Sequence, residues 1–275
     1  MKDLKNKHVI VTGASSGIGR SLATALAARG ADLVLAARKA EALNELAGSL
    51  QQRYGVRAIA VPTDVALEAD CRALIEQALA AFGNIDILIN NAGLSMRALF
   101  ADTELSVLKN LMDVNFWGTV YCTKYALPAL LKNGGSIVAV SSIAGFRGLP
   151  GRTGYSASKF AMNGFIESLR TELLPTGVHV LLACPGFTAS NIRVAALAKD
   201  GSSHGETSME EGKMMSADEV AERILAGIVE RRRTLIMTGQ GKMAVWLNKL
   251  WPSLADTMVF KHFTKEKNPL IRISR

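Results

Sequence analysis

Tyr155 and Lys159 lie four positions apart in the segment Tyr-Ser-Ala-Ser-Lys. Residues at positions i and i+4 share one face of a helix, so the lysine ammonium can lie beside the tyrosine phenol. A free tyrosine has a pKa near 10, and a neighbouring cation favours its phenolate form. Such a tyrosine can donate a proton to a developing alkoxide or take one from an alcohol. Many helices carry this spacing by chance, so a solvated pair is the alternative.

Two further polar residues fit the same chemistry. Ser142 lies thirteen positions before Tyr155, at the end of an expected strand, where its hydroxyl can hold a substrate oxygen. Asn115 lies in the middle of a long apolar helical pattern, where a side-chain amide needs a hydrogen-bond partner. Asn115 by itself has a simpler explanation as a satisfied buried polar residue. The set predicts proton transfer at a carbonyl or alcohol carbon.

A glycine-rich loop, Thr-Gly-Ala-Ser-Ser-Gly-Ile-Gly over 12–19, joins the first expected strand to a helix. Glycines let the backbone approach a pyrophosphate, and the helix N-terminus offers free N–H groups and a partial positive charge. The spacing is G-x-x-x-G-x-G, so the commoner G-x-G-x-x-G fingerprint does not match. We expect nucleotide binding, with a tight turn that holds no ligand as the alternative. The loop residues assigned to the cofactor are Gly13, Ser15, Ser16, Gly17, Ile18 and Gly19.

The end of the second expected strand indicates which nicotinamide cofactor is used. An acidic side chain about twenty residues after the loop would bind both ribose hydroxyls and repel a 2′-phosphate. The sequence there is Ala36-Ala37-Arg38-Lys39, which has no carboxylate. The Arg38 guanidinium suits a phosphate, although Arg38 and Lys39 are also explained as solvated residues at the start of a helix. We therefore predict NADP(H).

Short apolar runs alternate with amphipathic stretches along the chain. Continuous apolar strands are typical of a sheet covered on both faces, and alternation with helices makes the sheet parallel. We expect one α/β domain over residues 1–238, a doubly wound, Rossmann-like sheet of about seven strands with ligands beyond the strand carboxyl ends. The expected strands are 8–12, 32–37, 58–62, 85–89, 136–141, 178–183 and 235–238, and the expected helices are 17–29, 39–53, 66–82, 104–132, 155–174 and 216–231.

Residues 239–275 form a basic, amphipathic extension of that domain, with a break near Pro252. This tail contains seven lysines and arginines but only two acidic residues, Asp256 and Glu266. It can rest on an anionic membrane, cover the substrate entrance as a lid, or pack against the body or another subunit. We favour packing or a lid, because a Trp/Leu stripe is typical of a buried face. The apolar residues at helical spacing are Met243, Trp246, Leu247, Leu250, Trp251, Leu254, Met258 and Val259.

Composition excludes several classes of protein. The net charge of +8 is concentrated in the tail, and the rest of the chain shows neither a basic face nor a module that reads nucleic acid. Three scattered cysteines without a C-x-x-C spacing argue against a disulfide framework and a metal site. No hydrophobic signal region or run of roughly 20 apolar residues is present. We expect a cytoplasmic protein with, at most, peripheral membrane contact.

Taken together, the motifs resemble those of the short-chain dehydrogenase/reductase family. The similarity spans about residues 5–238 and covers, in family order, T-G-A-S-S-G-I-G, Asp64-Val65, N-N-A-G over 90–93, Asn115, Ser142, Y-S-A-S-K and Pro185-Gly186. The resemblance implies that Ser142, Tyr155 and Lys159 are catalytic. It also implies that Asn115 holds a water in a proton relay behind Lys159.

The resemblance further assigns the cofactor site. Lys159 would bind the nicotinamide ribose, and Asp64 with Val65 would frame the adenine. The cleft would be lined by Asn91, Ala92 and Gly93, and the nicotinamide faced by Pro185, Gly186 and Thr188. Ser190 is a further candidate for the carboxamide or phosphates. The family often has Thr at the position of Ser190 and an apolar residue at that of Thr188, so the sequence departs from the pattern at both.

Apolar residues near the expected strand ends indicate a hydrophobic carbonyl or alcohol substrate. A long stretch, 189–215, with methionines at 209, 214 and 215, is typical of a lid. We predict reduction of a ketone by NADPH, with alcohol oxidation or a non-catalytic NADP(H) sensor as the alternatives. The resemblance also implies a homodimer or homotetramer that pairs helices 104–132 and 155–174. The apolar residues assigned to the substrate side are Leu94, Met96, Ile143, Phe146, Leu149, Phe187 and Ile192.

Overall fold

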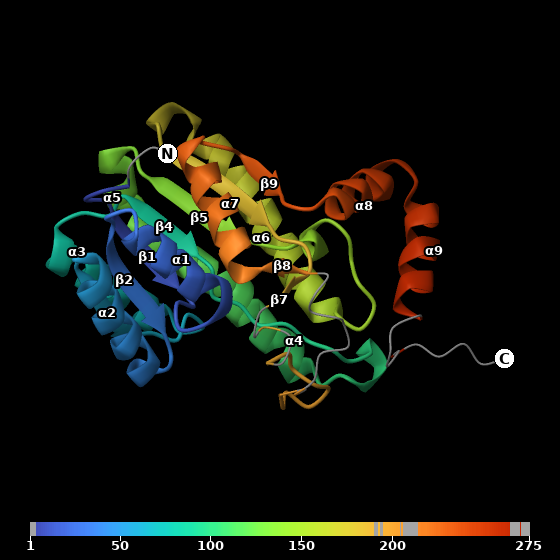
Figure 1. Ribbon diagram of the computed structural model, residues 1–275. Coiled ribbons are helices and arrows are strands. Elements are labelled where there is room, and N and C mark those ends of the chain that lie inside the picture. Colours follow the sequence, from blue (N-terminus) through green and yellow to red (C-terminus); the bar gives the residue numbers. More distant parts are fainter. Residues whose placement is uncertain are drawn as a thin grey trace.

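The computed structural model describes residues 4–189, 192, 195–203, 205, 214–264 and 270. Seven parallel strands form one sheet in the order β3-β2-β1-β4-β5-β6-β9 (Figure 1). The predicted doubly wound α/β architecture is therefore confirmed. The strands are β1 (His8–Thr12), β2 (Asp32–Ala37), β3 (Ala58–Pro62), β4 (Ile87–Asn90), β5 (Ser136–Val140), β6 (His179–Cys184) and β9 (Thr234–Ile236).

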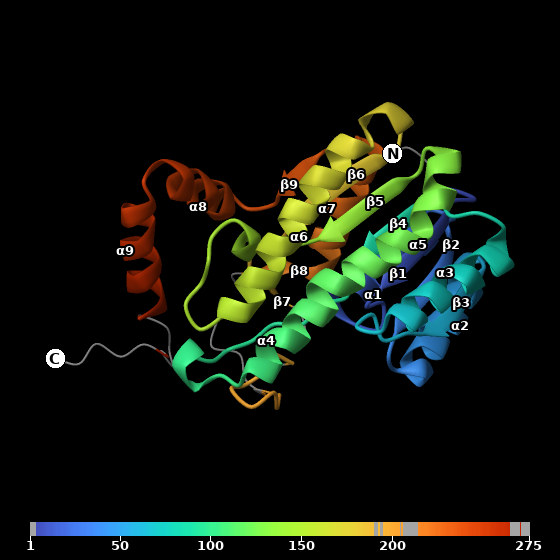
Figure 2. The same ribbon diagram turned by 180° about the vertical axis from the view of Figure 1, so that it is seen from behind.

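Helices cover both faces of the sheet (Figures 1 and 2). On one face α1 (Gly17–Ala27), α2 (Ala40–Tyr54) and α7 (Ala217–Val229) pack over apolar residues that alternate along the strands. On the other face α3 (Glu68–Phe82), α5 (Gly118–Asn133) and α6 (Thr153–Glu172) do the same. Every residue of β5 and β6 is buried, which is why these strands appear in the sequence as unbroken apolar runs.

The expected helix over 104–132 contains a local change of geometry. It consists of α4 (Leu105–Met112), a π-helical turn (Asp113–Trp117) and α5 in direct succession. π turns inside α-helices often occur at functional positions. Here the turn carries Asn115, and Gly118, which follows it, packs so tightly that a Cβ would lie 2.8 Å from the Val65 side chain.

The tail forms two helices, α8 (Gly239–Leu250) and α9 (Pro252–Phe263), that extend beyond β9 at one side of the sheet (Figure 1). The Arg147 guanidinium holds both of them, because it donates to Asn248 Oδ1 at 2.7 Å and pairs with Asp256. Asn248 also donates to the Phe146 carbonyl at 3.1 Å. The tail therefore packs on the loop after β5, and the predicted helical extension is confirmed.

Short elements complete the carboxyl edge of the sheet. β7 (Thr188–Ala189) pairs with β8 (Met215–Ser216). β5 ends at Val140, so Ser142 lies two residues beyond the strand and not at its last position. Within the described ranges, no helix has the combination of length and apolarity that crossing a bilayer requires.

Candidate active site

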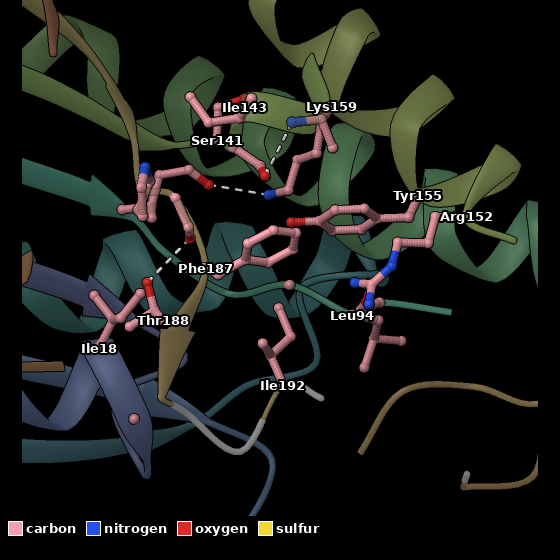
Figure 3. Close-up of a pocket in the computed structure, with 18 of the residues that line it drawn as sticks. Ile18, Leu94, Ser141, Ile143, Arg152, Tyr155, Lys159, Phe187, Thr188 and Ile192 are labelled. Atoms are coloured by element: carbon pink, nitrogen blue, oxygen red, sulfur yellow. Dashed lines mark hydrogen bonds between the residues drawn. The ribbon is translucent and has the colours of Figure 1, made fainter. Parts of the chain in front are cut away.

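A cavity of about 1840 Å³ lies at the carboxyl ends of the strands (Figure 3). It exceeds the roughly 300–1,000 Å³ of a pocket for one small ligand, so it has room for a dinucleotide and a substrate together. With the exception of buried Asn115, every residue in the predicted catalytic and cofactor sets lines it. These are Gly13, Ser15, Ser16, Gly17, Ile18, Gly19, Arg38, Asp64, Val65, Asn91, Ala92, Gly93, Ser142, Tyr155, Lys159, Pro185, Gly186 and Thr188.

The glycine loop forms a cradle with the geometry that a pyrophosphate requires. Gly13 has a φ of +66°, and a Cβ on Gly19 would lie 2.1 Å from the Gly13 carbonyl oxygen. Only glycine fits at these positions, since the loop turns back closely on the start of α1. Ser16 precedes α1 without capping it through its side chain, and the first turn of α1 has no acidic residue. Its free N–H groups and positive helix end suit an anion.

Asn91 holds this cradle against β4. Its side-chain amide donates to the Thr12 carbonyl at 2.9 Å and to the Gly13 carbonyl at 3.3 Å. The Thr12 hydroxyl in turn accepts from the backbone N–H groups of Asn91 and Ala92, each at 3.0 Å. Asn91 therefore binds the loop itself, which is a positioning contact that the sequence did not predict.

The far end of the cavity carries the residues assigned to the adenosine. Arg38 and Lys39 follow β2 and are exposed, and no ion pair engages Arg38 in the described part of the chain. Asp64 Oδ1 accepts from the Ala66 N–H at 3.0 Å, and the Asp64 N–H donates to Asp70 at 2.9 Å. These hydrogen bonds hold the turn after β3 in place. The exposed Arg38 guanidinium is accessible to an anionic group.

Tyr155 and Lys159 lie near the start of α6 and meet at the cavity wall. Lys159 Nζ lies 5.9 Å from the centroid of the Tyr155 ring and donates to the Val140 carbonyl at 3.0 Å. The phenol oxygen and the ammonium point toward the same space (Figure 3). Ser142 begins a short 3-10 turn, Ile143–Gly145, and its Oγ accepts from the Ala144 N–H at 3.1 Å. The arrangement supplies a proton donor, a cation and a hydroxyl at one wall.

Comparison with known proteins identifies the family. Residues 7–201 match the family model described as short chain dehydrogenase. The chain belongs to the short-chain dehydrogenase/reductase family. Dehydrogenase/reductase SDR family member 7B of Mus musculus is 36% identical over 269 residues, which cover 96% of this chain and 83% of the relative. The predicted family is confirmed, and the chain is an oxidoreductase that acts on a small-molecule substrate.

Two solved structures of short-chain dehydrogenases/reductases and related enzymes resemble this fold. A short-chain dehydrogenase/reductase from Burkholderia phymatum in complex with NAD has a TM-score of 0.82 and 26% identity over the whole of both chains. An alcohol dehydrogenase from Thermococcus sibiricus, complexed with 5-hydroxy-NADP, has a TM-score of 0.75 and 26% identity, covering 85% of this chain and 96% of that one. The two neighbours hold different nicotinamide dinucleotides.

Asn115 lies behind the cavity, and protein partners satisfy its amide. Its Oδ1 accepts from the Leu94 N–H at 2.7 Å, and its Nδ2 donates to the Leu94 carbonyl at 2.9 Å and to Ser158 Oγ at 2.8 Å. A methyl group on Gly93 would lie 3.1 Å from Asn115 Oδ1 and 3.6 Å from Lys159 Nζ. Both groups thus border the space beside Gly93. The simpler explanation of Asn115 holds for its side chain, and the water relay stays a prediction.

The substrate side is built partly from residues that the sequence did not assign to it. Leu94, Ile143, Leu149, Phe187 and Ile192 line the cavity as expected. The expectation for Met96 and Phe146 was wrong, because Met96 is fully buried in a core cluster and Phe146 packs against another. Ser190 and Met209 lie outside the described residues. The tail adds Gln240, Met243, Leu247, Met258, Val259, His262 and Phe263 to the lining.

Burial destabilises the charged form of Lys159. The side chain is 2% exposed, and desolvation lowers the pKa of its ammonium to about 8. At pH 7 the ammonium is still charged and can favour the phenolate form of Tyr155. The cost of keeping that charge in the folded cofactor-free protein is about 3 kcal/mol.

Lys159→Met is expected to remove this cost. Between pH 8 and 10.5 the unfolded chain binds more protons at Lys159 than the folded chain does, so the wild-type free energy of unfolding should rise with pH relative to that of Lys159→Met. The expected relative gain is about 3 kcal/mol, measured by urea unfolding of cofactor-free protein at several pH values. Lys124→Met, at an exposed position of α5, is the control. Parallel pH dependence of wild type and Lys159→Met would rule out the buried charge.

Proposed function

We propose that this enzyme reduces a hydrophobic ketone with NADPH, with Tyr155 as the general acid. The observation that carries the proposal is the continuity of one cavity from the glycine loop to Tyr155, Lys159 and Ser142. When bound, the nicotinamide dinucleotide supplies the hydride. The protein supplies position, a proton and fixed charge.

Each catalytic side chain has a defined task in this proposal. The Ser142 hydroxyl donates to the substrate oxygen and holds it near the phenol of Tyr155. Tyr155 gives its proton to that oxygen as negative charge develops there. Lys159 stabilises the resulting phenolate and binds the ribose, because its ammonium is charged below pH 8. The same groups run alcohol oxidation in reverse, and the cofactor ratio decides the direction.

The cofactor assignment rests on the chemistry of the cavity walls. The glycine loop with Asn91, Ala92 and Gly93 would hold the pyrophosphate and the adjoining ribose, and Asp64 with Val65 would frame the adenine. Pro185, Gly186 and Thr188 would face the nicotinamide. Arg38 favours NADP(H), since a 2′-phosphate would meet its guanidinium fork where a carboxylate would select NAD(H).

The substrate assignment rests on apolar walls from two sources. Phe187, Ile192 and Tyr155 line one cavity (Figure 3), and Met243, Leu247 and Met258 of the tail line it as well. Such walls favour a hydrophobic ketone whose oxygen is its one polar anchor. In this proposal residues 239–275 are an extension of the catalytic domain of residues 1–238, not a separate unit.

Two exposed apolar surfaces suggest what surrounds the enzyme. Leu105 on α4, Trp117 at the end of the π-helical turn and Phe160 on α6 are exposed, and we propose that α4, α5 and α6 pair across a two-fold axis in a homodimer or homotetramer. The three described cysteines are free and buried, which fits a reducing, cytoplasmic setting.

The second surface is the outer side of α8 and α9. Here the rings of Trp246 and Trp251 pack edge to face with their centroids 5.3 Å apart, and both residues are more than half exposed. Exposed lysines at 242, 249 and 261 accompany them. Tryptophan with lysine suits the headgroup region of an anionic bilayer, so we propose peripheral membrane contact through this side. The inner side of the same helices lines the cavity, which would give a membrane-dissolved substrate a short route.

Tyr155→Phe tests the acid role. Turnover should fall by about 100- to 10,000-fold, because general acid catalysis contributes that much, while the Kd for NADPH stays nearly unchanged. Turnover is measured by NADPH consumption with a panel of apolar ketones, and the Kd for NADPH is measured by fluorescence titration. Tyr121→Phe on α5 is the control. If Tyr155→Phe keeps most of its kcat, Tyr155 is not the acid. A wild type that binds NADPH but reduces none of the panel would favour the sensor alternative.

Arg38→Ala tests cofactor selectivity. We expect kcat/KM for NADPH to fall about 10- to 100-fold, the value of a charge-assisted hydrogen bond, with little change for NADH. Arg53→Ala, which removes the same charge from the last turn of α2, should leave both values unchanged. Wild-type preference for NADH would refute the assignment.

Two double variants distinguish the role of the outer side of α8 and α9 from that of the surface with Trp117 and Phe160. Trp246→Ser with Trp251→Ser should abolish co-sedimentation with phosphatidylserine/phosphatidylcholine vesicles while the oligomer mass in sedimentation velocity stays the same. Trp117→Ser with Phe160→Ser should do the opposite. High salt should weaken vesicle binding, since screening acts on exposed lysines. Loss of the oligomer in the tail variant would make that side an interface between copies, and no vesicle binding by wild type would dismiss the membrane contact.

A further inference from the structure

Asn163 lies on α6 one turn beyond Lys159, is 5% exposed and does not line the cavity. Its amide nevertheless contacts both ends of the turn that carries Ser142. Ser141 Oγ donates to Asn163 Oδ1 at 2.6 Å, and Asn163 Nδ2 donates to the Gly145 carbonyl at 2.8 Å. The Asn163 side chain is thus hydrogen-bonded both to Ser141, which precedes Ser142, and to Gly145, which ends the turn.

The turn is shaped to receive this amide. A Cβ on Gly145 would lie 2.7 Å from Asn163 Nδ2 and 2.9 Å from the Lys159 carbonyl oxygen. Position 145 therefore has to be glycine for the turn to lie directly on α6. Within the turn, the Gly145 N–H donates to the Ser142 carbonyl at 3.0 Å and the Ala144 N–H to Ser142 Oγ at 3.1 Å.

The same helix carries the other catalytic groups. Tyr155, Lys159 and Asn163 follow one another at four-residue spacing and so share a face of α6. Lys159 binds the Val140 carbonyl before Ser142, and Asn163 binds Ser141 and Gly145 on its two sides. The position of Ser142 relative to Tyr155 is therefore set through α6 and not by β5 alone.

We propose that Asn163 is a positioning residue that holds the Ser142 hydroxyl in line with Tyr155 and Lys159. The inference rests on the proposed catalytic role of Ser142. The amide matches both neighbours, because its oxygen accepts from the Ser141 hydroxyl while its nitrogen donates to the Gly145 carbonyl. Aspartate keeps the acceptor but loses the donor, and leucine loses both.

Asn163→Asp and Asn163→Leu test the proposal by ketone turnover at saturating NADPH. Both should lower kcat by about 10- to 100-fold, the effect of a small misplacement at a reacting centre, while the Kd for NADPH changes little. Ser141→Ala removes the other partner of the contact and should lower kcat in the same direction. Arg170→Met is the matched control, because Arg170 also lies on α6 and binds the Val180 and Arg233 carbonyls far from Ser142.

A double-mutant cycle with Ser142→Ala separates positioning from general destabilisation. If Asn163 acts through Ser142, Asn163→Asp should cost less than about threefold in kcat once Ser142 is alanine. Equal costs in both backgrounds, or wild-type kcat in Asn163→Asp and Ser141→Ala, would overturn the inference. If Ser142→Ala and Tyr155→Phe themselves retain wild-type kcat, the proposed function fails instead.

Discussion

The buried ammonium of Lys159, hydrogen-bonded to the Val140 carbonyl where β5 ends, links α6 to the sheet. Burying a cation costs free energy unless it has hydrogen-bond partners. Lys159 finds such a partner only when α6 packs at the end of β5, where the Val140 carbonyl lies. Tyr155 precedes Lys159 by about one turn of α6, and the turn with Ser142 packs on α6 at Lys159 and Asn163. The glycine at 145 and the amide at 163 follow from the same requirement, since the turn has to lie flat on α6.

Parallel strands give this arrangement its place in the molecule. All seven strands end at one edge, and the loops after them lie outside the seven-stranded sheet, with only the short β7-β8 pair and isolated bridges among the described residues. Side-chain contacts therefore brace the loops, as Asn91 does for the glycine cradle, Asp70 for the turn after β3 and Asn163 for the turn after β5. The cavity is the space that these braced loops leave between them.

The tail forms a further wall of that cavity and is held there by contacts with the loop after β5. Arg147 binds Asn248 on α8 and Asp256 on α9, and Ile143 packs so closely on α8 that a Cβ on Gly241 would lie 2.6 Å from its side chain. Ile143 directly follows Ser142, so the packing of the tail is connected to the turn that carries Ser142. A change in the position of α8 and α9 would therefore act on the turn with Ser142 through Ile143, in addition to the contacts of Arg147.

Local sequence was enough to predict the strands and most helices, although some strand ends and the π-helical turn within 104–132 differ from the prediction. The strands, the glycine cradle, the i and i+4 placement of Tyr155 and Lys159, and Arg38 after β2 follow from periodicity and spacing within a few residues. Proximity along the chain could not predict that Met96 and Phe146 pack in core clusters and do not line the cavity, because adjacent loop residues can have different surroundings. The apolar stripe of 243–259 predicted helices, but not which side of them would meet a substrate.

Tertiary structure alone decided the contacts between distant elements. Asn163 bonds residues 22 and 18 positions away, and no local pattern distinguishes it from any other polar residue on a helix. Gly118, which follows the π-helical turn at Asn115, likewise packs closely against Val65, about fifty residues earlier in the chain. The sequence determined which groups can do the chemistry, because their types and spacing are local. Packing determined which groups hold them in place, because that depends on what the folded chain brings together.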